Sequence, residues 1–264
     1  MSLGVVIKGP EGIVLAADSR VTLTAQRPNG PTLPINFDNA TKLLSLSPPH
    51  NHVGAVTYGA AVIGLRTAHS FMTEFEVELP EDRRLSVEEY AQRLRAFFTK
   101  QWEREMPEGY EGPAMTFIVG GYDEGAAYGR VFLFSIPDGS EPVEQNPGDR
   151  NFGMTWGGQL QIASRLIHGY DPNLLPILKQ SLDLSDNDLD SLVETLRQNL
   201  EFSIPYQILP LQDCVDLATL MIRTTIHAQN LSAGYRGVGG PIDVAAITRT
   251  DGLRYVQRKS LKVE

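Results

Sequence analysis

Two apolar, β-branched segments stand at the start of the chain, separated by a short turn sequence. The first runs from Leu3 to Lys8 and the second from Ile13 to Ala17, with Gly9-Pro10-Glu11-Gly12 between them. Such segments, joined by a turn that contains Gly and Pro, are typical of a β-hairpin. We therefore expect the chain to begin with two paired strands, with Ser2 immediately before the first.

The remaining sequence predicts strands and helices in alternating groups. Ser86-Val87-Glu88-Glu89 is a capping box that starts a helix, and the Pro- and Asn-rich stretch 27–39 is typical of a loop. The other expected elements are strands at 42–46, 53–58, 114–121, 130–135, 242–248 and 253–259, and helices at 60–75, 159–168, 188–200 and 213–229. This order predicts an α+β fold, a four-layer αββα sandwich with two sheets between two helical layers.

Length and composition favour one globular domain. The chain has 264 residues, of which 42% are hydrophobic, and this is enough for a single large core over residues 1–264. The apolar runs are shorter than the roughly 18 residues that a membrane span needs, and no secretory signal is evident. The net charge of −9 argues against nucleic acid as a partner. We expect a soluble, cytoplasmic protein that binds no membrane.

Ser2 is the first candidate for chemistry. An initiator methionine before a small residue is normally removed, which would make Ser2 the terminal residue. Its hydroxyl would then be a nucleophile and its own α-amine, with an unperturbed pKa of about 7.7–8.0, the base. Cys214 lies in an apolar helical pattern, where a buried structural thiol is the expected state. We expect neither a metal nor an organic cofactor.

Asp18 and Lys42 are the residues expected beside Ser2. The hairpin brings Asp18, at the end of the second strand, to the start of the first, and a neighbouring strand carries Lys42. A buried ammonium would favour the alkoxide and lower the pKa of the amine, and Asp18 would offset the cost of burying Lys42. The alternatives are a turn with a surface ion pair at Asp18-Ser19-Arg20 and a solvated lysine at position 42.

At this point the sequence resembles a known family. Gly4-Val5-Val6-Ile7 and the segment from Gly12 to Thr22 resemble the opening of proteasome β-type subunits, which are N-terminal-nucleophile (Ntn) hydrolases, and indicate a bacterial proteasome-related peptidase. The family's nucleophile, usually threonine, lies sixteen residues before its aspartate, and this interval leads from Asp18 back to Ser2. Thr41-Lys42-Leu43-Leu44 resembles its catalytic-lysine strand. The resemblance thus implies that Ser2, Asp18 and Lys42 are catalytic.

The stretch from Gly54 to Ala60 resembles the family's glycine-rich strand-to-helix turn. By this resemblance the backbone N–H of Tyr58, with Gly59 as the alternative, would bind the oxyanion. Thr22 would pair through its backbone with an extended peptide. The positions implied for an apolar substrate pocket are Val21, Ala40, Val56 and Ala60.

Other positions depart from the family. Gly157, Tyr235 and Val238 replace a serine, an aspartate and a serine that orient the terminal amine, and a helical insertion around residues 171–212 is atypical. The resemblance implies a peptide or unfolded-protein substrate, a homo-oligomeric ring and an ATP-dependent unfoldase that would feed it. Two alternatives stay open: a catalytically silent scaffold that forms rings, and an Ntn amidohydrolase of small amides.

Overall fold

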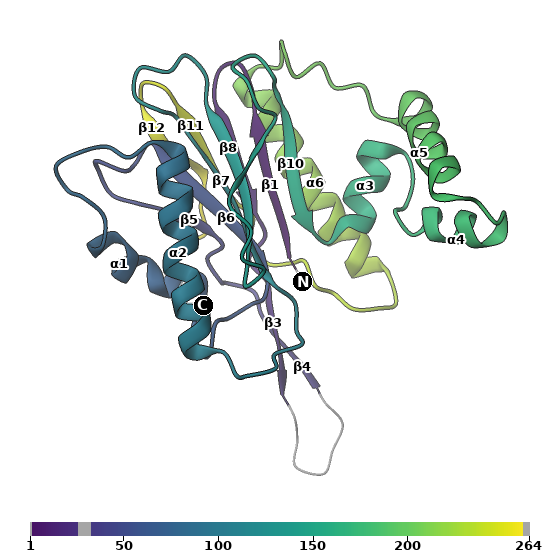
Figure 1. The fold of residues 1–264 in the computed structure, drawn as a ribbon, viewed down its shortest axis with the longest axis horizontal. Coiled ribbons are helices and arrows are strands. Elements are labelled where there is room, and N and C mark those ends of the chain that lie inside the picture. Colours follow the sequence, from purple (N-terminus) through teal and green to yellow (C-terminus); the bar gives the residue numbers. More distant parts are fainter. Residues whose placement is uncertain (1, 26–32, 261–264) are drawn as a thin grey trace.

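Two five-stranded antiparallel sheets form the centre of the computed structural model, which describes residues 2–25 and 33–260 (Figure 1). The first sheet has the order β10-β1-β2-β11-β12. Its strands are β10 (Gly153–Gly158), β1 (Leu3–Lys8), β2 (Ile13–Ala17), β11 (Asp243–Thr248) and β12 (Gly252–Gln257). The predicted N-terminal hairpin is confirmed, since β1 pairs with β2. The opposite neighbour of β1 is β10, which was not predicted.

The second sheet has the order β5-β6-β7-β8-β9. Its strands are β5 (Leu43–Ser45), β6 (Val53–Gly59), β7 (Met115–Gly121), β8 (Arg130–Ile136) and β9 (Val143–Gln145). A separate pair, β3 (Val21–Ala25) and β4 (Leu33–Phe37), extends below the two sheets in Figure 1.

The predicted loop at 27–39 was partly wrong, because β4 lies within it; residues 27–32 are outside the described part of the chain. Pro34 and Asn36 gave this stretch its loop-like composition. Proline is tolerated in β4 because an edge strand does not need a donor on its open side.

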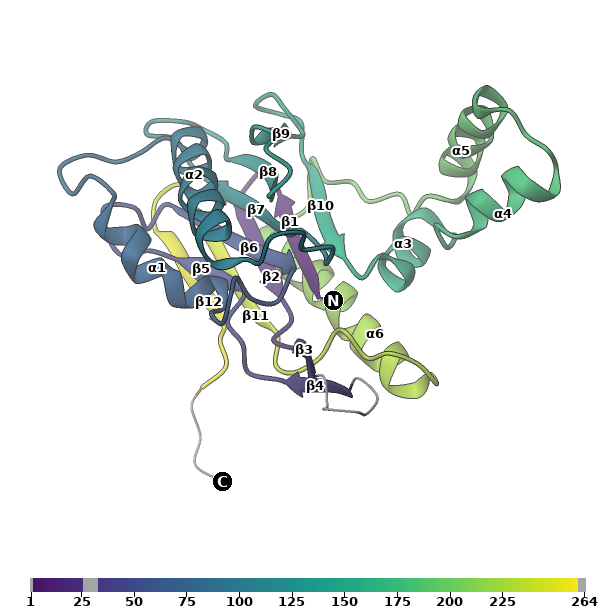
Figure 2. The ribbon, with the colours of Figure 1, turned by 60° about the horizontal axis from the view of Figure 1, so that its bottom comes forward.

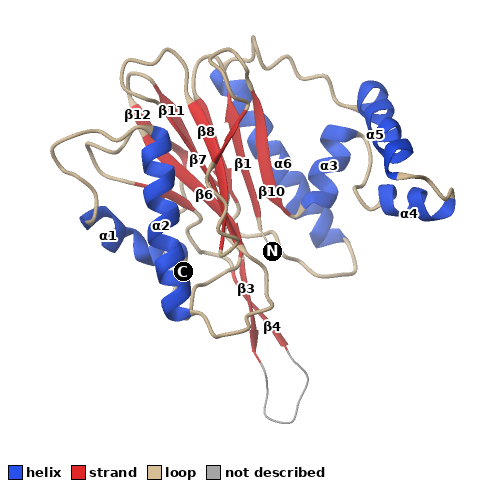
Figure 3. Ribbon diagram, viewed as in Figure 1, coloured by secondary structure: helices blue, strands red, loops and turns tan. Residues whose placement is uncertain are grey.

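Six helices are present in the described residues (Figure 3). They are α1 (Ala68–Val77), α2 (Val87–Glu105), α3 (Leu160–His168), α4 (Leu174–Ser181), α5 (Asp186–Leu200) and α6 (Leu211–Leu231). The predicted capping box is confirmed, since the Ser86 side chain accepts a hydrogen bond from the N–H of Glu89. The helix predicted from residue 60 begins only at Ala68, because the chain first turns through Gly64, whose φ of +58° is left-handed.

Three clusters of buried apolar side chains lie between these elements. One packs α1 and α2 against the second sheet and includes Phe71, Phe98 and Phe117. Another lies between the two sheets and includes Leu15 and Ile118. The last packs α3 and α6 against the first sheet. Burying one such side chain fully stabilises the fold by roughly 1.5–3 kcal/mol, so the three clusters hold the sheets and helices together.

The helices α4 and α5 form an arm that leaves the body of the protein after α3 (Figure 2). Neither helix contains a buried residue. The arm occupies most of the predicted insertion at 171–212, and α4 within it was not predicted.

Candidate active site

Ser2 lies at the start of β1, where its peptide groups are fixed on both sides. Its carbonyl oxygen accepts a hydrogen bond from the N–H of Gln159 at 2.7 Å. The following N–H, that of Leu3, donates to Oδ1 of Asp18 at 3.0 Å. Only 6% of Ser2 is exposed. The structure thus holds Ser2 in one buried position beside Asp18; Met1, whose removal the sequence predicts, is outside the described residues.

The carboxylate of Asp18, just after β2, accepts four hydrogen bonds. Its Oδ1 accepts from Leu3 and from Nζ of Lys42, at 2.7 Å. Its Oδ2 accepts from the N–H of Arg20 at 3.1 Å and from that of Gly239 at 3.0 Å. Both Asp18 and Lys42 are buried. A buried charge is tolerated where a partner and several hydrogen bonds compensate its lost hydration, and this carboxylate has both.

Lys42 immediately precedes β5 in the second sheet. Its carbonyl oxygen accepts a hydrogen bond from the N–H of Thr57, which fixes its backbone. Burial lowers the pKa of the Lys42 ammonium, and the adjacent Asp18 carboxylate partly opposes this shift. A lysine with a lowered pKa releases its proton more readily than a solvated one. The alternative of a solvated lysine does not hold.

Tyr58 and Gly59 lie at the end of β6, facing a cavity that Ser2 also lines. The cavity measures about 250 Å³ and is completed by Pro113, Thr116 and Gly158. The backbone at Gly59 is left-handed, with φ of +94°, and a Cβ there would lie 2.1 Å from the carbonyl oxygen of Ala114. Only glycine fits this turn.

Ser2 also lines a second, much smaller space of about 20 Å³. Lys42, Thr57 and Tyr58 line it. Of the predicted substrate-binding residues, Val21, Ala40 and Ala60 line it as well. The structure therefore places three of the five predicted substrate-binding positions around Ser2.

The other two predicted substrate-binding positions lie elsewhere. Val56 is buried in the cluster between the two sheets and is not among the lining residues. Thr22 lies on β3, where its hydroxyl donates to Oδ1 of Asn36 at 2.7 Å. On its other edge, β3 has no neighbouring strand among the described residues, which leaves that edge open to an extended chain.

Arg20 and Asp38 belong to this site, although the sequence analysis did not identify their pairing. The guanidinium donates to both carboxylate oxygens of Asp38, at 2.5 and 2.8 Å, and to the carbonyl of Arg236 at 3.2 Å. The hydrogen bond from Arg20 holds the pKa of Asp38 below its ordinary value. Arg20 also fills the space beside Gly239, where a Cβ would lie 2.4 Å from its Cζ. The pair therefore anchors the loop that brings Gly239 to Asp18.

The same loop contains two of the positions at which the resemblance fails. Tyr235 is exposed, whereas Val238 is buried and its N–H donates to Oε1 of Gln229 at 2.9 Å. Gln229 comes from α6 and was not predicted. Its position four residues after Thr225 and seven after Ile222, on the buried face of the helix, was the one sequence signal for it.

Among solved structures, the chain is similar to Anbu (ancestral beta-subunit) from Yersinia bercovieri, with 16% identity, a TM-score of 0.56 and coverage of 96% of this chain and 86% of that one. It is also similar to a mutant Anbu from Hyphomicrobium sp. strain MC1, with 17% identity, a TM-score of 0.57 and coverage of 98% and 86%. A further Anbu structure from that strain gives 16% identity, a TM-score of 0.54 and coverage of 97% and 86%. The fold is similar to that of Anbu proteins.

The expected membership of the proteasome β-type family was wrong. The matching structures are Anbu proteins, which are proteasome-like but distinct. The sequence matches no protein-family model and no curated protein. The expectation rested on a terminal hairpin followed by an aspartate and a lysine. These residues form one end of the two sheets. They report the proteasome-like fold and do not distinguish one group with that fold from another.

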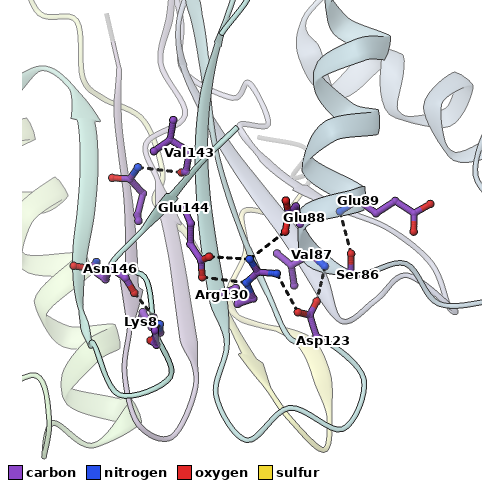
Figure 4. A network of polar contacts seen from close by, with 12 residues as sticks. Lys8, Ser86, Val87, Glu88, Glu89, Asp123, Arg130, Val143, Glu144 and Asn146 are labelled. Atoms are coloured by element: carbon purple, nitrogen blue, oxygen red, sulfur yellow. Dashed lines mark hydrogen bonds and ion pairs between the residues drawn. The ribbon is translucent and has the colours of Figure 1, made fainter. Parts of the chain in front are cut away.

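At the other end of β1, Lys8 is a second buried lysine (Figure 4). Its Nζ donates to the carbonyls of Asn146, at 3.0 Å, and Gly148, at 2.7 Å. Burial lowers the pKa of Lys8, and the charge of Glu144 opposes this shift. Glu144 itself pairs with Arg130 at 2.7 Å. Because two backbone carbonyls bind Nζ of Lys8 directly, this lysine fixes the loop that contains Asn146 and Gly148. Such contacts are typical of a structural site.

The described part of the chain contains no helix long and apolar enough to cross a membrane. In the same residues no group of three or more His, Cys, Asp or Glu side chains is placed to hold a metal ion.

The thiol of Cys214 is buried, and this raises its pKa to about 11. The rings of His50 and His52 hydrogen-bond to backbone carbonyls, those of Pro80, Pro49 and Leu85.

Proposed function

We propose that this protein is an N-terminal-nucleophile hydrolase that cleaves peptide bonds with Ser2 after Met1 has been removed. One observation carries the proposal: Ser2 is buried beside an Asp18 carboxylate that is shared between Nζ of Lys42 and the N–H of Leu3. The Anbu-like, proteasome-like fold supports the proposal at the level of architecture.

In the proposed reaction, Oγ of Ser2 attacks the carbonyl carbon of the substrate while the α-amine of Ser2 takes the hydroxyl proton. The C–N bond then breaks, the departing amine takes that proton, and an ester with Ser2 remains. A water molecule hydrolyses the ester and regenerates the hydroxyl. The Lys42 ammonium favours the developing negative charge, and Asp18 keeps the ammonium in place.

The backbone favours Gly59 over Tyr58 as the oxyanion donor. The N–H of Thr57 donates to the carbonyl of Lys42, on the β5 side of β6. Successive N–H groups of a strand face opposite neighbours, so the N–H of Tyr58 faces β7 and that of Gly59 faces the β5 side, past the end of β5. Ser2 and Gly59 line the same cavity.

The test is the intact mass of the purified protein before and after exposure to an electrophile that captures N-terminal nucleophiles. Ser2→Ala is the matched control, because alanine also permits methionine removal but lacks the hydroxyl. Loss of the methionine mass together with labelling that Ser2→Ala abolishes supports the hydrolase. A retained Met1, or processing without labelling, favours the silent scaffold.

An Ntn amidohydrolase of small amides is the second candidate, and one observation favours it. The space of about 20 Å³ beside Ser2 holds roughly one water molecule and no apolar side chain. An extended peptide with large side chains would need more room there than the structure provides.

The proposed architecture is a single proteasome-like Ntn-hydrolase domain over residues 1–264. Its two sheets would form the four-layer αββα sandwich, supported by the helices that pack on the outer face of each sheet. The arm within residues 171–212 would be an insertion into that domain. A homo-oligomeric ring fits the Anbu-like fold; an unfoldase partner and a cytoplasmic location stay predictions.

A further inference from the structure

Two consecutive N–H groups tie the loop before β11 to different parts of the protein. The N–H of Val238 donates to Oε1 of Gln229 at 2.9 Å. The next one, that of Gly239, donates to Oδ2 of Asp18 at 3.0 Å. Gln229 lies near the end of α6, a helix that packs on the first sheet, whereas Asp18 follows β2. The loop therefore bridges this helix and the carboxylate of the candidate site.

The side chain of Gln229 is buried with only one of its polar atoms satisfied. The residue is 6% exposed, and its Nε2 has no hydrogen-bond partner among the described residues. A buried donor without a partner costs free energy that an apolar side chain of the same shape would avoid. What the carboxamide adds over such a side chain is therefore its oxygen, the acceptor for Val238.

Solvent cannot replace this acceptor, because Val238 has no exposed surface. A buried N–H is almost always paired, so without Oε1 of Gln229 the segment would have to move toward another acceptor. Gly239 is the next residue and would move with it. Its hydrogen bond to Asp18 would then lengthen or break.

The number of donors on Asp18 sets how strongly its charge acts on the groups beside it. The charged side chains near Lys42 include Asp18, Arg20, Asp38 and Lys259. An N–H that donates to a carboxylate stabilises its negative charge. A carboxylate with one donor fewer is more basic and stabilises neighbouring ammonium groups more strongly, so the pKa of those groups rises.

We propose that Gln229 is a positioning residue for the candidate site. Its carboxamide oxygen fixes Val238 and thereby holds the N–H of Gly239 on the Asp18 carboxylate. By this means it keeps the α-amine of Ser2 less basic, so that more of this amine is free to take a proton. The effect on the amine rests on the proposed function, in which that amine is the base; the hydrogen bonds from α6 to Asp18 do not.

The first experiment is hydrogen exchange at the N–H of Gly239, followed by NMR. Gln229→Met keeps the length of the side chain but lacks the acceptor, and exchange should become about tenfold faster. Gln229→Glu keeps an acceptor oxygen and should restore slow exchange. Gln101→Met is the matched control, because Gln101 is also a buried glutamine in a helix, with its Oε1 unpaired in the described structure. It should leave exchange at Gly239 unchanged.

The second experiment measures the rate at which the electrophile labels Ser2 as a function of pH. In Gln229→Met the pH of half-maximal rate should rise by about half a unit, so that labelling well below this midpoint is about threefold slower. A loss of folded protein would lower the amount labelled but would not move the midpoint. Gln101→Met should keep the midpoint of the wild type.

Wild-type exchange at Gly239 in Gln229→Met overturns the proposal, and so do equal changes in Gln101→Met. Faster exchange without a shifted midpoint overturns the effect on the amine. If the wild type is not labelled at any pH, the proposed function fails, and exchange at Gly239 still decides whether Gln229 positions the loop. Gln229→Asn, whose amide is one methylene group closer to the helix, replaces Gln229→Met in both experiments if that variant does not fold.

Discussion

The Asp18 carboxylate lies 2.7 Å from Nζ of Lys42, and the two buried side chains come from different sheets. Asp18 follows β2 in the first sheet, and Lys42 precedes β5 in the second. The ion pair therefore joins the two sheets at the end where Ser2 lies. Replacing Asp18 should change the unfolding free energy more than replacing Lys42, because Asp18 also accepts three backbone hydrogen bonds.

Removing the charge of Asp18 should destabilise the protein strongly. In Asp18→Asn the new amide NH2 group would face a donor in either orientation: the N–H groups of Arg20 and Gly239, or Nζ of Lys42. The buried ammonium of Lys42 would also lose its counter-charge. Breaking a buried ion pair on one side typically costs about 3–5 kcal/mol. Chemical denaturation of Asp18→Asn measures the loss of unfolding free energy.

Lys42→Met is the comparison for Asp18→Asn. It leaves Asp18 with three backbone N–H donors, so we expect it to cost less than Asp18→Asn. An equal or larger loss of unfolding free energy in Lys42→Met would show that the ammonium, and not the carboxylate, organises this end of the sheets.

Tyr58 and Gly157 should be energetically coupled. Gly157→Ala places a methyl group within the volume of the ring, and overpacking of this kind costs about 1–3 kcal/mol. In the Tyr58→Ala background the same substitution has room, so the double variant should lose less stability than the sum of the two single variants. Gly234→Ala, with open space around its Cβ, is the control and should be nearly neutral.

The N-terminal hairpin and most of the strands follow from local sequence. The segments 3–7 and 13–17 contain no polar side chain because both faces of the first sheet are buried, and this makes them recognisable. In contrast, β10 contains Gly157 and Gly158 and was not predicted. Those glycines are set by the ring of Tyr58 and the carbonyl of Ser2, which are remote in sequence.

Lys8 should make stability depend on pH at high pH. Its folded-state pKa is lowered by burial, so between that pKa and the ordinary value of 10.5 the unfolded chain binds more protons than the native one. The unfolding free energy of the wild type, relative to Lys8→Met, should therefore rise as the pH increases toward 10.5 and be constant well below this window. Denaturation of both proteins across that range measures it, and a flat or falling difference contradicts the assignment.

The pairing of Arg20 with Asp38 should hold the loop before β11 in place. Arg20→Lys keeps the charge but loses the two-point contact with Asp38. Because Asp38 is partly exposed, we expect a stability change below about 1 kcal/mol, but faster hydrogen exchange at the N–H of Gly239. Arg83→Lys, which changes the exposed two-point contact with Glu89, is the matched control and should leave that N–H unaffected.

The arm formed by α4 and α5 should open more readily than α6. Neither helix of the arm contains a buried residue, whereas α6 buries Cys214, Ala218, Met221 and other side chains. Local opening is easiest where few apolar contacts hold an element. Hydrogen exchange followed by mass spectrometry should show fast exchange over 174–200 and slow exchange over 214–229. Equal protection of the arm and α6 would contradict this.

Part of the candidate site was predictable and part was not. The N-terminal hairpin alone brings Asp18 close to Ser2, whereas the expectation for Lys42 rested on the resemblance of residues 41–44 to a lysine-bearing strand. The roles of Arg20, Asp38 and Gln229 depend on the path of the loop 235–240, which carries no periodic pattern. The fit of the Tyr58 ring against Gly4 and Gly157 depends on how one sheet packs on the other, and a sequence pattern does not contain that packing.

Asp18 accepts hydrogen bonds from residues 3, 20, 42 and 239, and the last of these is 221 positions away along the chain. During synthesis the N-terminal hairpin leaves the ribosome first, and nearly the whole chain must follow before Gly239 reaches the carboxylate. A partly translated chain therefore carries Ser2 without the completed set of contacts around Asp18. The candidate site is thus completed last, although Ser2 and Asp18 are made first.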